Sequence, residues 1–86
     1  MRVFFHKYFD KRFARLPGKV QAKATEKIKL FCHDPFEPGL RNHRLTGKYE
    51  GLRSIDITGD YRAVYDPVSE SEALFIDIGT HSQLYG

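Results

Sequence analysis

The stretch from Leu52 to Tyr65, LRSIDITGDYRAVY, decides the fold, because it predicts two short strands joined by a turn at Thr58-Gly59-Asp60. Apolar and polar residues alternate on both sides of the turn, so each strand has an apolar and a charged face. The residues expected to face the core are Ile55, Ile57, Tyr61, Ala63 and Tyr65. The residues expected on the opposite face are Ser54, Asp56, Arg62 and Val64.

Residues 74–78, LFIDI, repeat this alternation and predict a third strand. The pattern directs Leu74, Ile76 and Ile78 toward the core and Phe75 and Asp77 away from it. The acidic segment between the second and third strands, residues 66–72, is expected to be a flexible hairpin loop. Together these segments predict a small antiparallel sheet that is covered on one face only.

The N-terminal third of the chain has the period of two amphipathic helices. An apolar stripe in the first helix consists of Phe5, Phe9, Phe13 and Leu16. Pro17-Gly18 ends this helix, and a second one is expected from there to His33. Its stripe consists of Val20, Ala24, Ile28 and Phe31. Met1 to Phe4 has β character and is expected to be a short edge strand. The fold class is therefore α+β, with a helical hairpin packed on one face of the sheet.

Length and composition limit the remaining possibilities. Eighty-six residues allow one domain with a small core, and Cys32 is the only cysteine, so a disulfide framework is excluded. No apolar run approaches the ~20 residues that span a bilayer, and no leader pattern is present. We therefore expect a cytoplasmic protein without a membrane partner. The formal net charge of +3 is compatible with an anionic partner.

The basic residues are concentrated before residue 54, and one row of them follows the helical period. Lys19, Lys23 and Lys27 lie on one side of the second helix. Such a row is typical of a solvated helix face, but clustered lysines also attach to nucleic acid by releasing counterions. Both interpretations are open from the residues alone.

A metal site is not indicated. His6, His33, His43, His81 and Cys32 show none of the close paired spacings of zinc ligands. No glycine-rich loop between a strand and a helix is present to hold a nucleotide cofactor. The sequence therefore predicts neither a metal nor a cofactor.

The predicted sheet brings several polar side chains toward one end. These are His43 before the first strand, Asp56 and Arg62 on the open face, Asp60 in the turn, and His81 and Tyr85 after the last strand. Cleaving RNA without a metal requires removing the proton of a 2′-hydroxyl, stabilising a phosphorane and protonating the 5′-oxygen. Imidazoles can exchange these protons, and a guanidinium matches phosphate oxygens. A tyrosine can stack on a base or donate a proton.

Three motifs carry a resemblance to a known family. They are residues 42–54, NHRLTGKYEGLRS; residues 59–65, GDYRAVY; and residues 79–86, GTHSQLYG. In this order and spacing they resemble the toxins of the RelE/ParE superfamily, closest to the YafQ branch. The resemblance covers nearly the whole chain and implies a toxin of a type II toxin–antitoxin system, with a RelE-like fold, that cleaves messenger RNA in the ribosomal A site.

The resemblance also implies site residues. His43, Asp60, His81 and Tyr85 match the functional positions of the YafQ-like pattern, whereas Asp56 stands where that branch has a histidine. Arg62 matches the phosphate-contacting arginine of the RelE and YoeB branches.

On this basis we expect His81 to act as general acid. His43 is expected to orient or deprotonate the 2′-hydroxyl together with Asp60 or Asp56, and Arg62 to hold the phosphate. Residues expected to contact RNA are Arg44, Lys48, Arg53, Lys19, Lys23 and Lys27.

The partners implied are a neutralising antitoxin of the RelB or DinJ type and the 70S ribosome with its mRNA. Operator DNA is expected to be bound only through the antitoxin complex. Two alternatives are open: a ParE-like poison of DNA gyrase without nuclease activity, and a catalytically weakened regulator that only binds its antitoxin.

Overall fold

The hairpin around residues 58–60 forms the middle of a five-stranded sheet. In this computed structural model, which describes all 86 residues, β3 (Arg53–Asp56) pairs with β4 (Tyr61–Ser69), and β4 pairs with β5 (Glu72–Thr80). β1 (Arg2–Phe5) and β2 (His43–Arg44) form the edges, and the order is β1-β5-β4-β3-β2. The helices are α1 (Lys7–Ala14), α2 (Gly18–His33) and α3 (His81–Tyr85), with short 3-10 helices η1 (Pro38–Leu40) and η2 (Gly47–Tyr49). The predicted α+β class is confirmed.

The predicted N-terminal edge strand is also confirmed, but it makes the sheet mixed rather than antiparallel. β1 runs parallel to β5, with Arg2 opposite Glu72 and Phe5 opposite Phe75. A parallel neighbour requires a long crossover connection, and here nearly the whole chain lies between the two strands. Alternation within a strand does not encode the direction of a partner that lies so far along the sequence.

The helical hairpin forms as expected, except that the first helix begins later than predicted. Phe5 belongs to β1, and the side chain of His6 caps α1 by accepting a hydrogen bond from the Tyr8 backbone N–H at 3.0 Å. α2 has the predicted limits, because Pro17 precedes its first turn and Pro35 follows its end. No helix has the combination of length and apolar character that a membrane span requires.

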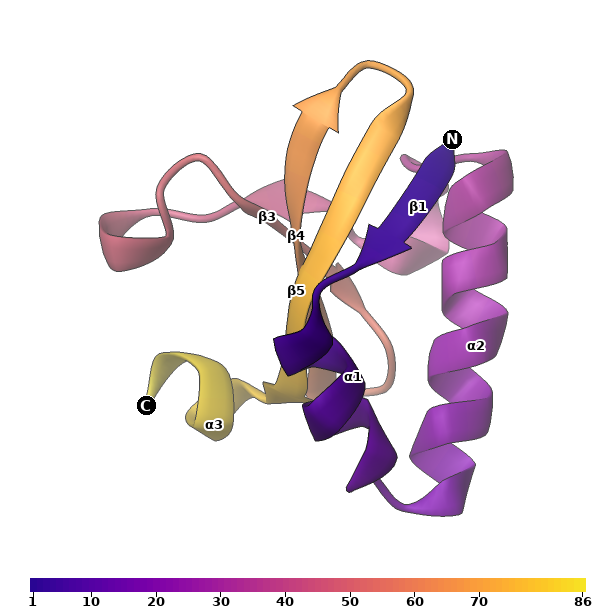
Figure 1. Cartoon of the computed structure of the whole chain (residues 1–86), viewed down its shortest axis with the longest axis vertical. Coiled ribbons are helices and arrows are strands. Elements are labelled where there is room, and N and C mark those ends of the chain that lie inside the picture. Colours follow the sequence, from indigo (N-terminus) through magenta and orange to yellow (C-terminus); the bar gives the residue numbers. More distant parts are fainter.

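α2 packs along one face of the sheet (Figure 1), and aromatic rings fill the space between them. The ring of Phe31 on α2 is fully buried and meets Tyr65 and Phe75 edge to face, at centroid distances of 4.9 and 5.3 Å. Edge-to-face pairs stabilise a core beyond their buried area. Phe31 therefore joins the helical layer to both central strands.

The alternation predicted for β5 is wrong at three positions, because the strand contains a β-bulge. Val64 lies opposite Asp77 and Tyr65 lies opposite Phe75, so Ile76 has no partner of its own on β4. An extra residue reverses the alternation on one side of the bulge. Phe75 is consequently fully buried in the core, whereas Leu74 and Ile76 are only half-buried. Ile78, beyond the bulge, is buried as predicted.

The second face of the sheet is partly covered, in contrast to the prediction. α3 lies on the side of the sheet opposite α2 (Figure 1). Its Leu84 is buried, as are Ser54 and Val64, which lie opposite each other on β3 and β4. A short C-terminal helix thus closes one part of the charged face and leaves the remainder open.

Residues 66–72 are not the flexible loop that was expected. β4 continues to Ser69 and β5 begins at Glu72, so the turn contains only Glu70 and Ser71. A register irregularity between Asp66 and Ser69 accommodates Pro67, which lacks the N–H that a regular ladder needs. The paired strands therefore extend well beyond the predicted hairpin.

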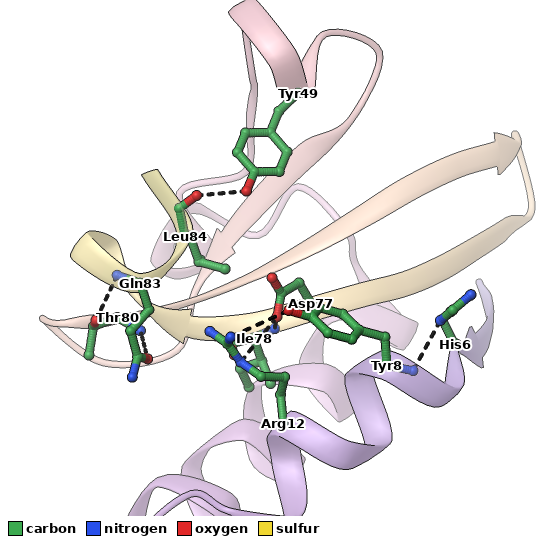
Figure 2. A network of polar contacts seen from close by, with 9 residues as sticks. All are labelled: His6, Tyr8, Arg12, Tyr49, Asp77, Ile78, Thr80, Gln83 and Leu84. Atoms are coloured by element: carbon green, nitrogen blue, oxygen red, sulfur yellow. Dashed lines mark hydrogen bonds and ion pairs between the residues drawn. The ribbon is translucent and has the colours of Figure 1, made fainter. Parts of the chain in front are cut away.

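The C-terminal segment leaves β5 as predicted but then forms a helix that was not predicted. Thr80 Oγ1 accepts the Gln83 N–H at 3.1 Å, and Gln83 Oε1 accepts the Thr80 N–H at 2.9 Å. This reciprocal arrangement is a capping box (Figure 2). It starts α3 immediately at the end of β5.

Arg12 fastens α1 to β5 beyond the point where β1 ends. Its guanidinium Nε donates to the Ile78 carbonyl at 3.4 Å and lies 3.5 Å from Asp77 Oδ1 (Figure 2). A β-carbon on Gly79 would lie 2.7 Å from Arg12 Nη2, so the guanidinium occupies space that only glycine leaves free. Arg12 therefore protects an edge of β5 that no strand covers.

Because of the bulge in β5, truncating Phe75 should destabilise the protein more than truncating its neighbour Ile76. Phe75→Ala should lower the free energy of unfolding by about 3–5 kcal/mol, because it leaves a cavity among packed rings. Ile76→Ala should cost roughly 1 kcal/mol, because that side chain lies at the bulge and is half-buried. Urea titrations of both variants measure the difference. A larger loss for Ile76→Ala would contradict the observed register.

Candidate active site

A wide cleft opens on the charged face of the sheet, on the side opposite α2. Its volume is about 830 Å³. The lining residues come from the segment around β2, from the β3–β4 hairpin and from α3: Arg41, Asn42, His43, Arg44, Leu45, Thr46, Asp56, Arg62, His81 and Tyr85. Five of the six residues expected from the sequence to be catalytic line it. Asp60 is the exception.

The hairpin register explains why the charged residues meet. Asp56 and Arg62 lie directly opposite each other on β3 and β4, and both point away from the core that Ile55 and Ala63 enter. His43 reaches the same face because β2 pairs with β3, with His43 opposite Ser54. The alternation that places Ile55 and Ala63 in the core therefore also places Asp56 and Arg62 at the cleft.

Arg62 is held firmly in the cleft by three backbone carbonyls and a carboxylate. Its Nη1 donates to the carbonyls of Thr58, Gly59 and Tyr61 at 2.9, 3.1 and 3.1 Å. Its Nε lies 2.9 Å from Asp56 Oδ1. These contacts fix the guanidinium beside the hairpin turn. Only Nη2 makes no contact of this kind.

Asp56 is shared between two arginines. Its second oxygen, Oδ2, lies 3.5 Å from Nε of Arg41, whose side chain is 78% exposed, whereas the Asp56 side chain is 17% exposed. One carboxylate thus contacts two guanidinium groups. Asp56 is therefore suited to holding the side chains of Arg41 and Arg62 in place.

The ring of His43 is oriented by a backbone carbonyl. His43 Nδ1 lies 2.8 Å from the Arg41 carbonyl oxygen. Since a carbonyl oxygen only accepts hydrogen bonds, Nδ1 carries the proton of the neutral ring, and Nε2 retains its lone pair. The side chain is exposed, so this lone pair is available to a ligand.

α3 brings His81 and Tyr85 to the other wall of the cleft. His81 is the first residue of the helix, and its ring contacts that of Tyr85 at a centroid distance of 4.8 Å. Tyr85 also meets Tyr49 edge to face at 5.6 Å, and the Tyr49 hydroxyl donates to the Leu84 carbonyl at 2.6 Å (Figure 2). The segment around η2 therefore holds the end of α3. The Tyr85 hydroxyl is buried without a hydrogen-bond partner.

The side chain of Asp60 is exposed in the hairpin turn and does not line the cleft. Its backbone carbonyl accepts the His81 N–H at 3.1 Å, which ties the start of α3 to the turn. Asp60 is thus joined to the site through the main chain.

The residues expected to contact RNA lie on three different surfaces. Arg44 lines the cleft, and Lys48 lies over the ring of Tyr49 at 5.3 Å. Arg53 lines a neighbouring groove, where its Nε donates to Asn42 Oδ1 at 2.8 Å. The third surface is α2, on the far side of the sheet, and it carries Lys19, Lys23 and Lys27.

Sequence reasoning missed three residues that shape the site. Asn42 donates to Pro35 O and to the Tyr65 hydroxyl, both at 2.8 Å, and so anchors the start of β2 on the core. Tyr49 supports α3, and Arg41 contacts both Asp56 and His43. The basic run around position 41 was the only signal for Arg41, because its role depends on contacts across the sheet.

The electrostatics of the cleft favour an anionic ligand. Three arginines and one aspartate line it, together with two histidines. No group of three or more His, Cys, Asp or Glu side chains is arranged to hold a metal ion. The site can therefore attract a phosphate, and its imidazoles can exchange protons with a ligand bound there.

Several solved structures share the fold of this chain. YafQ from E. coli strain BL21(DE3) superposes with a TM-score of 0.82 at 19% identity, covering 100% of both chains. A chain of the E. coli DinJ-YafQ toxin-antitoxin complex gives 0.79 at 18% identity, covering 98% of this chain and 96% of that one. A chain of the toxin-antitoxin complex RelBE2 from Mycobacterium tuberculosis gives 0.75 at 18% identity, covering 93% and 96%.

At these identities the structural matches establish the fold alone. No curated protein sequence gives a significant match. The family is established by a family model described as a bacterial toxin of type II toxin-antitoxin system, YafQ, which matches residues 1–86. Because this match spans the whole chain, the protein belongs to the YafQ family of toxins of type II toxin–antitoxin systems.

Proposed function

We propose that this toxin is an mRNA interferase, a ribosome-dependent endoribonuclease that cleaves by metal-free attack of a ribose 2′-hydroxyl. The observation that carries the proposal is the cleft itself: two histidines on separate elements, His43 and His81, line one open site that also contains Arg62. Membership of the YafQ family supports the same activity.

In the proposed reaction, His43 is the general base. Its Nδ1 is engaged by the Arg41 carbonyl, so Nε2 is the atom that takes the proton of the 2′-hydroxyl. Asp56 is less suited to this role, because both of its oxygens face guanidiniums. Asp60 contributes by holding the start of α3 through its carbonyl. This assignment gives each acidic residue a positioning role.

The 2′-oxygen then attacks the adjacent phosphorus, and the bond from phosphorus to the 5′-oxygen breaks. Guanidinium groups meet the charge that builds up on the phosphorane oxygens. His81 gives its proton to the departing 5′-oxygen, so the products are a 2′,3′-cyclic phosphate and a free 5′-hydroxyl. The ring of Tyr85 packs against His81 and steadies the imidazole, and it offers a surface on which a base can stack.

Contacts outside the cleft would hold the message and the ribosome. Arg44 lies at the cleft, and Lys48 lies close by, over Tyr49, so both can reach neighbouring phosphates. Arg53 supports this region through Asn42. The lysines of α2 lie on the other side of the sheet, so they would bind a different segment of ribosomal RNA.

We further propose that a cognate antitoxin neutralises the toxin. Two of the solved structures that share this fold are toxin-antitoxin complexes, one with DinJ and one described as RelBE2. An antitoxin of the DinJ or RelB type would block access to a cleft this open. Any binding of operator DNA would then occur through the complex.

His81→Ala should relieve growth arrest, because removing a positioned general acid slows cleavage about 10²–10⁴-fold. Primer extension on a message after induction measures the cleavage. Ser82 is the next residue on α3 and is also exposed, so Ser82→Ala should cleave like the wild type. Antitoxin binding should be retained in both variants.

Unchanged toxicity of His81→Ala would remove that residue from the mechanism. If the wild-type protein alters DNA supercoiling and leaves messages uncut, the toxin is a gyrase poison and the proposal fails.

Charge reversal on α2 should separate ribosome binding from chemistry. Replacing Lys19, Lys23 and Lys27 by glutamate should weaken ribosome binding and reduce its dependence on salt, because fewer counterions are released. The matched triple replacement by arginine keeps the charge and should bind as the wild type does. Sedimentation with ribosomes over a salt series measures both. Equal binding by the two triple variants would show that this row is only a solvated surface.

A further inference from the structure

The two arginines beside Asp56 differ in how many of their donors are free. Three backbone carbonyls occupy Nη1 of Arg62, and Asp56 occupies its Nε, so this guanidinium keeps only Nη2 for a ligand. Bidentate recognition of phosphate requires two parallel N–H donors. Arg62 can therefore supply its charge and one donor nitrogen to a phosphate, but not the two parallel N–H donors of the planar fork.

Arg41 has the donors that Arg62 lacks. Its side chain makes one polar contact, between Nε and Asp56 Oδ2 at 3.5 Å, and it is 78% exposed. Nη1 and Nη2 make no hydrogen bond or ion pair. The carboxylate thus directs the guanidinium to the cleft without using its outer edge. Both nitrogens of that edge are available to the oxygens of one phosphate.

The backbone of Arg41 is in an uncommon left-handed conformation. Its φ and ψ angles are 49° and 47°, and it is the only residue other than glycine with positive φ. Such a conformation persists only when surrounding contacts impose it. The Arg41 N–H donates to the Pro38 carbonyl at 3.1 Å, and Asn42 is anchored on the core. The chain therefore turns sharply at the point where it enters the cleft.

This turn also connects Arg41 to the proposed base. The same residue supplies the carbonyl that His43 Nδ1 contacts at 2.8 Å and the side chain that reaches Asp56. One left-handed residue thus sets the position of a guanidinium fork and the tautomer of an imidazole.

We propose that Arg41 is the main phosphate-binding arginine of the cleft and that Asp56 is the positioning residue that holds Arg41 and Arg62 toward the ligand. The inference rests on the proposed function and specifies which residues hold the scissile phosphate. Asp56 takes no proton from the substrate.

Arg41→Ala should lower kcat/KM for cleavage of a ribosome-bound message about 10- to 100-fold, the loss expected for hydrogen bonds to a charged group. Arg41→Lys should recover only a small part of this, because an ammonium group cannot form the fork.

Arg2→Ala is the matched control. Arg2 is 74% exposed, and its Nη1 lies 3.6 Å from Glu72 Oε2, in an ion pair like that of Arg41. It belongs to β1, at the edge of the sheet opposite β2, and does not line the cleft. This variant should cleave like the wild type. Wild-type activity of Arg41→Ala, or full recovery by Arg41→Lys, would overturn the inference. A wild-type protein that cuts no message in the same assay would refute the proposed function itself.

Asp56→Asn distinguishes positioning from proton transfer. If Asp56 is a positioning residue, Asp56→Asn should lower kcat and leave the acidic limb of the pH–rate profile in place, because His43 still takes the proton. Loss of that limb would identify Asp56 as the base and overturn its assignment. If Asp56 acts through Arg41, the effect of Arg41→Ala should shrink in the Asp56→Asn background. Fully additive effects would contradict the coupling. Antitoxin binding and urea unfolding check that each variant is folded.

Discussion

The register of the β3–β4 hairpin is the constraint on which the rest of the structure depends. Ile55 opposes Ala63 on the face that α2 covers, and Asp56 opposes Arg62 on the other face. A slip of one residue would expose the apolar pair and bury the ion pair, which would cost both hydrophobic burial and desolvation of charge. The packing of the core therefore fixes the geometry of the cleft, so the site needs no separate scaffold.

The face of the sheet opposite α2 has two parts, one covered by α3 and one that stays open. Leu84 of α3 is buried, and so are Ser54 and Val64 on the same side of the sheet. The carbonyl of Asp60 fastens the start of α3, and the hydroxyl of Tyr49 fastens its end. A helix of five residues is not stable on its own, so these tertiary contacts hold it in place. The part of the face that α3 leaves uncovered forms the cleft.

The two arginines that contact Asp56 have different roles in the cleft. Arg62 uses most of its donors to hold the hairpin turn, whereas Arg41 keeps its outer edge unoccupied. The single carboxylate of Asp56 lies close to both guanidinium groups, so the cleft keeps an excess of positive charge. The family resemblance did not indicate a role for Arg41. The place of its side chain in the cleft depends on an uncommon backbone conformation and on Asp56, its partner in β3.

Local patterns in the sequence determined the α+β class, the central hairpin, the limits of α2 and the segments that line the cleft, because each depends on periodicity or turn chemistry over a few neighbouring residues. Only the tertiary structure decided the parallel direction of β1, the bulge at Ile76, the partial cover by α3 and the sharing of Asp56 between two arginines. These features depend on contacts between residues far apart in the chain. The energies of such contacts arise from packing and pairing, which no local pattern encodes.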